Sequence, residues 1–176
     1  NSNTKLIPMT FNKLPNGIGI VADSIALDCN GAILKGTSKT GSVGIYNYQS
    51  ENVVIKNCNI ENYTYGIEFF YSWANYYNNI TSNTLRNNMG SDIFLNNNAA
   101  DTQVINYNNI YNNNIYGNIT YTHTNNNTYC VDGIGNTYFG SATGPTCAGM
   151  YAYDGLEVNS NTKLIPMTFN KLPNGI

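Results

Sequence analysis

The four cysteines are the residues with the clearest possible chemistry, either as disulfides or as metal ligands. No two of them form a Cys-x-x-Cys pair, and the only histidine, His123, lies in a segment rich in threonine and asparagine. A metal site is therefore the weaker alternative, because an even number of scattered cysteines is typical of an exported, disulfide-bonded protein. We expect no cofactor and two disulfides. The expected pairs are Cys130 with Cys147, and Cys29 with Cys58.

The acidic residues are the other candidates for chemistry, because enzymes that cleave polysaccharides use carboxylates as acids, bases or calcium ligands. They are Asp23, Asp28, Glu51, Glu61, Glu68, Asp92, Asp101, Asp132, Asp154 and Glu157. If the chain forms stacked coils of about 25 residues, no three of them fall on one face. Two pairs would approach each other, Asp23 with Glu51 and Asp132 with Asp154, but isolated turn residues are the simpler interpretation. We therefore expect a protein that is not an enzyme.

Asn-x-Thr sequons are typical of glycosylated surface proteins, although a chain rich in asparagine also produces them by chance. The candidates are Asn62, Asn79, Asn118 and Asn126. Asn79 and Asn118 each precede an isoleucine that we expect to point inward, so their own side chains should point outward. Asn62 and Asn126 are expected at turns.

An aromatic-rich stretch, residues 63–77, contains the only tryptophan of the chain. Strand alternation would send about half of these rings into the core and half outward. We expect the outward rings to contact a neighbouring protein module. The candidates for this assembly surface are Tyr63, Tyr65, Tyr71, Trp73, Tyr76 and Tyr77. A planar aromatic pair beside asparagine and acidic groups would instead indicate carbohydrate binding.

An internal repeat determines which elements must position these residues. Aliphatic residues recur in three columns at a step of 25 or 26 residues: Ile55, Ile80 and Ile105; Ile60, Leu85 and Ile110; and Ile67, Ile93 and Ile119. Polar residues alternate with them, which predicts short strands rather than helices. Each unit is too short for a pair of sandwich hairpins, so one coil per unit, stacked on the next at about 4.8 Å, is the economical solution. The sequence predicts a parallel β-helix.

Stacked coils place acids beside basic residues of the next coil. The expected ion pairs are Asp28 with Lys56, and Glu61 with Arg86, the only arginine. Asparagines recur at residues 57, 59, 83, 108 and 109, which predicts ladders of side-chain amides along the axis. Glycine precedes an inward isoleucine at Gly17, Gly44 and Gly66, and we expect these glycines to adopt positive φ at corners.

Three stretches resemble the opening of NosD-like right-handed β-helix domains, which are common in archaeal and bacterial surface and S-layer-associated proteins. They are NGIGIVAD (residues 16–23), IALDCNGAI (residues 25–33) and NVVIKNCNI (residues 52–60), with GNTY (residues 135–138) similar to the closing element. The resemblance implies an all-β, right-handed, single-stranded parallel β-helix of about six coils. It implies little about function, because this fold carries enzymes, adhesins and passive scaffolds.

The composition excludes several classes of protein. Only 10% of the 176 residues are charged and the formal net charge is -2, so there is no basic face for nucleic acid. No run of apolar residues is long enough for a membrane span. About a fifth of the chain is asparagine.

Residues 1–18 reappear without change as residues 159–176. We therefore expect one β-helix module over residues 1–158, with residues 159–176 as the first segment of the next identical module. An open coil end invites pairing with another copy. The predicted function is a structural module of an extracellular cell-surface filament, sheath or S-layer, whose partners are identical modules. The resemblance implies an archaeal source. The alternative is a carbohydrate-binding adhesin module.

Overall fold

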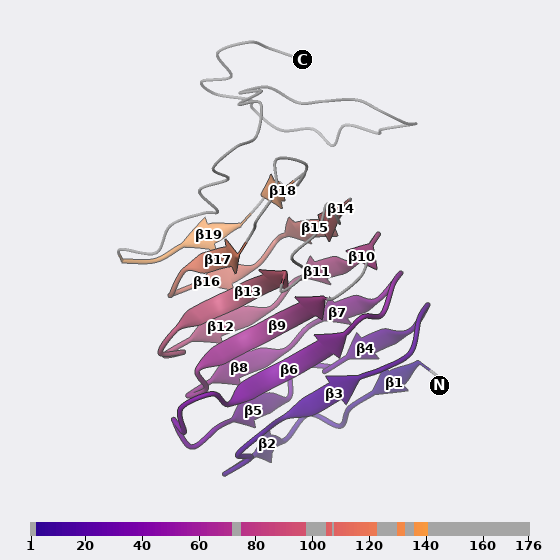
Figure 1. The fold of residues 1–176 in the computed structure, drawn as a ribbon. Helices are drawn as coiled ribbons and strands as arrows, with labels where there is room; N and C mark the ends of the chain where they lie inside the picture. The colour runs from indigo at the N-terminus through magenta and orange to yellow at the C-terminus, as the bar shows by residue number, and fades with distance from the viewer. Residues whose placement is uncertain are drawn as a thin grey trace.

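The computed structural model describes residues 3–71, 75–97, 105–106, 108–122, 130–132 and 136–140. These residues contain strands and turns and no helix. The chain coils around one axis, and Figure 1 shows the coils stacked in chain order from the N-terminal end. Successive coils contribute strands to three parallel sheets, which we name A, B and C. The predicted all-β parallel solenoid is confirmed.

The strands are short, as expected when each coil turns after a few residues. Sheet A consists of β1 (Thr4–Lys5), β4 (Ala26–Asp28), β7 (Val54–Lys56), β11 (Asn79–Thr81), β15 (Asn108–Tyr111) and β18 (Cys130–Asp132). Sheet B consists of β2 (Thr10–Phe11), β5 (Ile33–Lys35), β8 (Asn59–Glu61), β12 (Thr84–Arg86), β16 (Asn114–Ile115) and β19 (Thr137–Tyr138). Sheet C consists of β3 (Ile18–Ile20), β6 (Val43–Tyr48), β9 (Tyr65–Tyr71), β13 (Ser91–Asn97) and β17 (Ile119–Thr122).

A small fourth sheet pairs β10 (Asn75–Tyr76) with β14 (Ile105–Asn106). Within the described residues, the 5-stranded sheet C limits the number of complete coils to five, and β18 and β19 belong to a further coil. This is slightly fewer complete coils than the six that we expected.

The register confirms one of the three predicted columns and corrects the other two. Ile67, Ile93 and Ile119 pair in sheet C as expected. In sheet A, however, Ile80 pairs with Ile110, and Ile105 lies in the small sheet opposite Asn75. In sheet B the residue beside Leu85 is likewise Ile115 and not Ile110. The physical reason is that the connection from β13 to β15 is longer than the connection from β9 to β11 in the preceding coil. Loops of a solenoid absorb insertions without disturbing the sheets.

The interior of the coil is a continuous apolar column. The largest fully buried side chains are Tyr63, Phe69, Leu34, Ile45, Ile55, Ile60, Ile67, Ile80, Leu85 and Ile93. Fully burying an aliphatic or aromatic side chain of this size contributes about 1.5–3 kcal/mol. Because each coil adds such residues directly above those of the previous coil, the column grows with every repeat.

The corners account for some of the asparagines. The residues that follow strands β7, β11 and β15 are Asn57, Ser82 and Asn112, and each has φ between 54° and 57°. Asn62 and Asn87 adopt the same conformation after β8 and β12, with φ of 63° and 57°. Left-handed backbone is costly for most side chains, and asparagine tolerates it best among the non-glycine residues. A left-handed corner therefore favours asparagine, and serine occupies the equivalent place at Ser82.

The glycines before the inward isoleucines do not have positive φ, so our expectation for them was wrong. In the described residues, positive-φ glycines occur at Gly31, Gly41 and Gly140 instead. A Cβ atom on Gly17 would lie 1.8 Å from the carbonyl oxygen of Gly44, and one on Gly44 would lie 2.6 Å from that of Gly66. These glycines are needed because successive coils approach so closely at this corner that no side chain fits between them.

Candidate functional site: the outer face of sheet C

The outer face of sheet C carries a cluster of aromatic rings around one carboxylate. Its members are Tyr46 and Tyr48 on β6, Tyr65, Glu68 and Phe70 on β9, and Phe94 and Asn96 on β13. We call this set the sheet C cluster. Sheet C runs along the near side of the solenoid in Figure 1.

Register and alternation build this cluster. Tyr46, Glu68 and Phe94 are direct neighbours across the three strands, and Tyr48, Phe70 and Asn96 form the adjacent column. The residues between them, such as Ile67, Phe69 and Leu95, are buried in the core. Since side chains alternate along a strand, burying one set places the other on the outer face. Tyr65, at the start of β9, has the parity of the buried set and joins the cluster through its ring contact with Phe94.

The rings of the cluster contact one another. Tyr48 and Phe70 are almost parallel, with an interplanar angle of 9° and ring centroids 5.9 Å apart. Tyr46 lies 6.1 Å from each of these two rings. On the other side, Tyr65 stacks on Phe94 at 4.6 Å. Offset stacking of this kind stabilises aromatic pairs and leaves their outer surface available for contact.

Glu68 lies between the two groups of rings and is only 7% exposed. The amide of Asn96 donates a hydrogen bond to its Oε1 atom at 2.8 Å. Burial raises the pKa of Glu68, and the hydrogen bond from Asn96 opposes this shift. The pKa of the Tyr46 phenol is also raised, first by burial and then by the charges of Glu68 and Tyr48. The cluster therefore combines an apolar surface with a carboxylate that is poorly solvated.

The predicted aromatic stretch is divided between core and surface. Tyr63 is fully buried, so it is not part of an assembly surface, and this prediction was wrong. Tyr65 belongs to the sheet C cluster, and Tyr77 is 55% exposed. The side chains of Tyr71 and Tyr76 and the whole of Trp73 lie outside the described residues.

Sequence reasoning missed most of the sheet C cluster. Tyr46, Tyr48 and Phe94 stand outside the aromatic stretch and reach it only because β6, β9 and β13 pair side by side. The signal was present in the correct column of Ile67 and Ile93. Counting one residue onward from these positions gives Glu68 and Phe94, which are neighbours.

Both predicted ion pairs are present between neighbouring coils. Lys56 Nζ lies 3.6 Å from Asp28 Oδ2, and Arg86 Nε lies 2.8 Å from Glu61 Oε2. The structure adds Lys35, whose Nζ lies 2.9 Å from Glu61 Oε1, so Glu61 is held from the coils on both sides. Lys35 and Arg86 hold the pKa of Glu61 below its usual range, against the opposing effect of burial. Hydrogen bonds from Asn57 and Asn30 lower the pKa of Asp28, and Lys56 adds a smaller effect.

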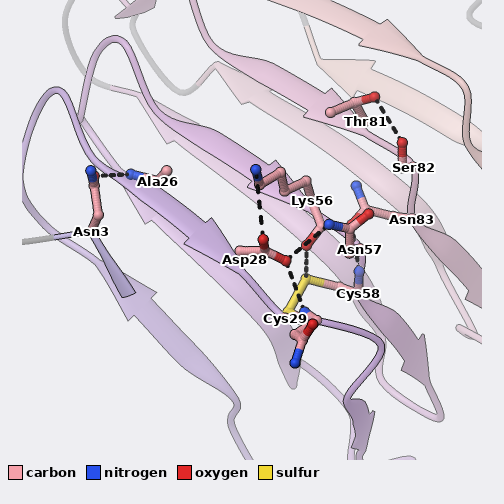
Figure 2. A network of polar contacts seen from close by, with 11 residues as sticks. Asn3, Ala26, Asp28, Cys29, Lys56, Asn57, Cys58, Thr81, Ser82 and Asn83 are labelled. Atoms are coloured by element: carbon pink, nitrogen blue, oxygen red, sulfur yellow. Dashed lines mark hydrogen bonds and ion pairs between the residues drawn. A yellow bond between two sulfur atoms is a disulfide. The ribbon is translucent and has the colours of Figure 1, made fainter. Parts of the chain in front are cut away.

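Cys29 and Cys58 form a disulfide with Cα atoms 4.8 Å apart, as the sequence predicts. Figure 2 shows it at the corner after sheet A, beside Asp28, Lys56 and Asn57. The bridge joins neighbouring coils, because Asp28 pairs with Lys56 on the strands that lead into it. Cys147 lies outside the described residues, so its pairing with Cys130 stays a prediction.

A ladder of buried asparagines continues from this disulfide along the axis. The backbone N–H of Cys58 donates to Asn83 Oδ1, that of Asn83 to Asn113 Oδ1, and that of Asn113 to Asn136 Oδ1, each at 2.9 Å. The amide groups of Asn83 and Asn113 also donate to the carbonyls of Ile55 and Ile80. The predicted amide ladder therefore exists, with Asn83 as the one member that we named correctly.

Other asparagines of the predicted ladder make different contacts. Asn57 donates to Asp28 and Asn59 donates to the carbonyl of Gly31. The side chains of Asn108 and Asn109 lie outside the described residues. An open polar hollow of about 330 Å³ lies at this corner, lined by Asn30, Gly31, Asn57, Asn59 and Ser82. It contains amides, a hydroxyl and backbone but no acid or base.

Asp92 is a second buried carboxylate, at the start of β13. Its oxygens accept hydrogen bonds from Asn88 Nδ2 at 2.8 Å and from the backbone N–H groups of Tyr116 and Gly117 at 2.9 and 2.6 Å. Burial raises its pKa, and these three donors oppose the shift. Through these hydrogen bonds Asp92 positions the backbone of Tyr116 and Gly117 in the next coil. Because Asp92 is fully buried, it is not accessible to a ligand.

The remaining predicted residues are placed as follows. Asn118 is exposed, whereas Asn62 and Asn79 are half-buried and Asn126 lies outside the described residues. Asp23 and Glu51 do approach, but through the backbone N–H of Glu51, which donates to Asp23 Oδ1 at 2.8 Å. Asp154 lies outside the described residues.

In the described part of the chain, no three His, Cys, Asp or Glu residues gather as a metal site. That same part contains no helix long and apolar enough to cross a membrane.

The comparison with protein families agrees with this geometry. Residues 7–130 match the model described as a right-handed β-helix region, which covers more than two thirds of the 176 residues. The chain belongs to the right-handed β-helix family. The hand of the coil follows from this membership, and so does the parallel stacking seen in the three sheets. No curated protein and no solved structure gives a significant match to this β-helix.

Proposed function

We propose that this β-helix is a structural module of an extracellular cell-surface filament, sheath or S-layer. In this proposal modules assemble head to tail through the coil ends and laterally through faces rich in tyrosine and asparagine. The observation that carries the proposal is the first coil. Its strands β1, β2 and β3 are end strands of their sheets within the described residues, and residues 1–18, which contain β1 and β2, recur without change as residues 159–176.

The first coil is also unusually apolar on its outside. Ile7, Met9 and Val21 are 67%, 46% and 75% exposed, and all three lie in this coil. These residues lie in the connections beside β1, β2 and β3. Exposed apolar side chains next to unpaired strand edges favour contact with another chain. A contact that is repeated from head to tail gives an open filament. The NosD-like resemblance adds the cell-surface location and the archaeal origin to the proposal.

The internal stabilisation suits a passive role outside the cell. The disulfide Cys29–Cys58, the amide ladder and the ion pairs of Glu61 each join neighbouring coils. We place the protein outside the cell because disulfides persist in oxidising compartments. The exposed Asn118 is the best of the glycan candidates in the described residues.

Electron microscopy and sedimentation velocity of the purified chain test this proposal. We expect filaments or concentration-dependent oligomers, whose formation is reduced when Val21 is replaced by Asp. The matched control is Met89→Asp, because Met89 is also an exposed apolar residue, 56% exposed, and lies in a later coil. A chain that stays monomeric over a wide range of concentrations would argue against assembly.

A carbohydrate-binding adhesin module is the second candidate. The observation that favours it is the nearly parallel pair of Tyr48 and Phe70 beside Glu68 and Asn96. Aromatic rings bind sugar rings by stacking, while amide and carboxylate groups bind the hydroxyls. A glycan array with the Phe70→Ala variant as control distinguishes this function, because a pure assembly module would bind no glycan.

A further inference from the structure

Glu68 is a nearly buried carboxylate on the outer face of sheet C, and the described residues provide no cation for it. Glu61 and Asp28 are both ion-paired, and the described part of the chain contains no ion pair to Glu68. The amide of Asn96 donates a hydrogen bond to its Oε1 atom. A carboxylate that is 7% exposed loses most of its hydration, which is costly unless an opposite charge compensates.

The rings around Glu68 make this position suitable for an ammonium group. Tyr46 and Phe94 flank Glu68 in register, and Phe70 lies beside it on the same strand. Aromatic faces attract cations through their quadrupole, and the attraction increases when the cation loses water. A carboxylate between rings is therefore complementary to an alkylammonium group, which combines a positive charge with an apolar stem.

The chain itself presents such a group. Lys39 is exposed and makes no ion pair within the described residues. Its backbone is held firmly, because its carbonyl oxygen accepts hydrogen bonds from the Ser42 N–H, the Ser42 hydroxyl and the Thr64 hydroxyl at 3.1, 2.5 and 3.0 Å. A side chain that is presented on an ordered loop loses less entropy when it binds.

We propose that the sheet C cluster of one molecule receives the ammonium group of Lys39 from a second copy of this chain, with Glu68 as its counter-ion. Donor and acceptor are different surfaces, so the contact is not self-complementary and can continue from copy to copy. The inference rests on the proposed function and specifies its lateral contact. It places that contact on β6, β9 and β13 rather than on the stretch of residues 71–77.

Zero-length crosslinking with a carbodiimide tests the contact directly. An equal mixture of isotopically heavy and light full-length chains is crosslinked and digested, and the peptides are identified by mass spectrometry. We expect Glu68–Lys39 amide links between a heavy and a light chain. Links that occur only within one chain, or from Glu68 to another lysine, would overturn the inference.

Sedimentation velocity supplies the second measurement. We expect Glu68→Gln, which keeps the size and the Asn96 contact, to weaken self-association about tenfold, and Lys39→Met to have a similar effect. The double variant should be no weaker than either single variant, because both remove the same contact. Lys39→Arg is the matched control, because it keeps the positive charge at this position and should therefore self-associate as the wild-type chain does.

The outcomes separate this inference from the proposed function. If the wild-type chain assembles and Glu68→Gln assembles equally well, the inference fails and the filament proposal stands. If the wild-type chain does not assemble at any concentration, both fail. If Glu68→Gln abolishes binding to a neutral oligosaccharide without changing self-association, the sheet C cluster is a sugar site and the inference also fails.

Discussion

Individual side chains in this β-helix are selected by the corner geometry and by burial. Asparagine supplies both the left-handed residues, such as Asn57 and Asn112, and the buried amides, such as Asn83 and Asn113. The short amide side chain tolerates positive φ and offers a donor and an acceptor at once. In the described residues, these asparagines therefore follow from the geometry of the coil.

Tyr63 gives a test of burial at the scale of one atom. Its side chain is fully buried, and its hydroxyl has no hydrogen-bond partner in the described structure. Burial raises the pKa of Tyr63 to about 12. Because an unpaired buried hydroxyl costs about 1–3 kcal/mol, Tyr63→Phe should raise the free energy of unfolding by about 1 kcal/mol.

Urea denaturation measures this change, with Tyr116→Phe as control because Tyr116 is 46% exposed and its hydroxyl can be solvated. A clear loss of stability in Tyr63→Phe would mean that the hydroxyl is bonded after all.

Glu61 gives a test of charge that depends on pH. Lys35 and Arg86 lower its pKa below the ordinary value of 4.5, so the folded state favours the carboxylate more than the unfolded state does. This contribution to stability is present at neutral pH and is lost as the pH falls through the lowered pKa. Glu61→Gln should therefore reduce the free energy of unfolding by about 1 kcal/mol at neutral pH.

The measurement is thermal or chemical unfolding of both proteins from neutral pH to about pH 2, where the difference should disappear. A difference that is the same at every pH would show that packing of the side chain, and not its charge, is responsible.

At the scale of secondary structure, neighbouring strands are held by the apolar column and by the ladder at the corner after sheet A. Asn113 is the central member of that ladder. It accepts from the backbone N–H of Asn83, and its amide donates to the carbonyls of Ile80 and Tyr111. Each ladder member therefore satisfies backbone groups that the corner would leave unpaired.

Asn113→Ala should lower the free energy of unfolding by about 2–4 kcal/mol, because it leaves at least two buried backbone groups without partners. The matched control is Asn114→Ala, since the side chain of Asn114 is exposed and makes one long contact of 3.4 Å to Thr84. Urea denaturation of the two variants gives the comparison. Equal losses at both positions would contradict a special role of the ladder.

For the whole molecule, the stack of coils predicts a gradient of stability from the middle to the end. The central coils pair on both sides, whereas β1, β2 and β3 are end strands. Ile7 and Val21 of the first coil are also exposed, at 67% and 75%. Regions with few buried contacts open at lower free energy.

Hydrogen exchange measured by mass spectrometry should therefore show fast exchange in the first coil and slow exchange in strands β8, β9, β12 and β13. Under conditions of assembly, the first coil should become protected if coil ends form the contact. Uniform exchange along all coils, or protection that never depends on concentration, would contradict this prediction.

The sequence by itself determined the class of the fold, because period-2 alternation repeated at a nearly constant step leaves few alternatives to a parallel solenoid. It also determined the column of Ile67, Ile93 and Ile119, the bridge between Cys29 and Cys58, and two ion pairs, since all of these follow from stacking equivalent positions. Only the tertiary structure decided the register of sheets A and B beyond β13. The connection that follows β13 is longer than the one that follows β9, and this difference shifted Ile105 out of the expected column. The sheet C cluster was also a tertiary result, since its residues come from three coils and only strand pairing brings Tyr46, Glu68 and Phe94 together.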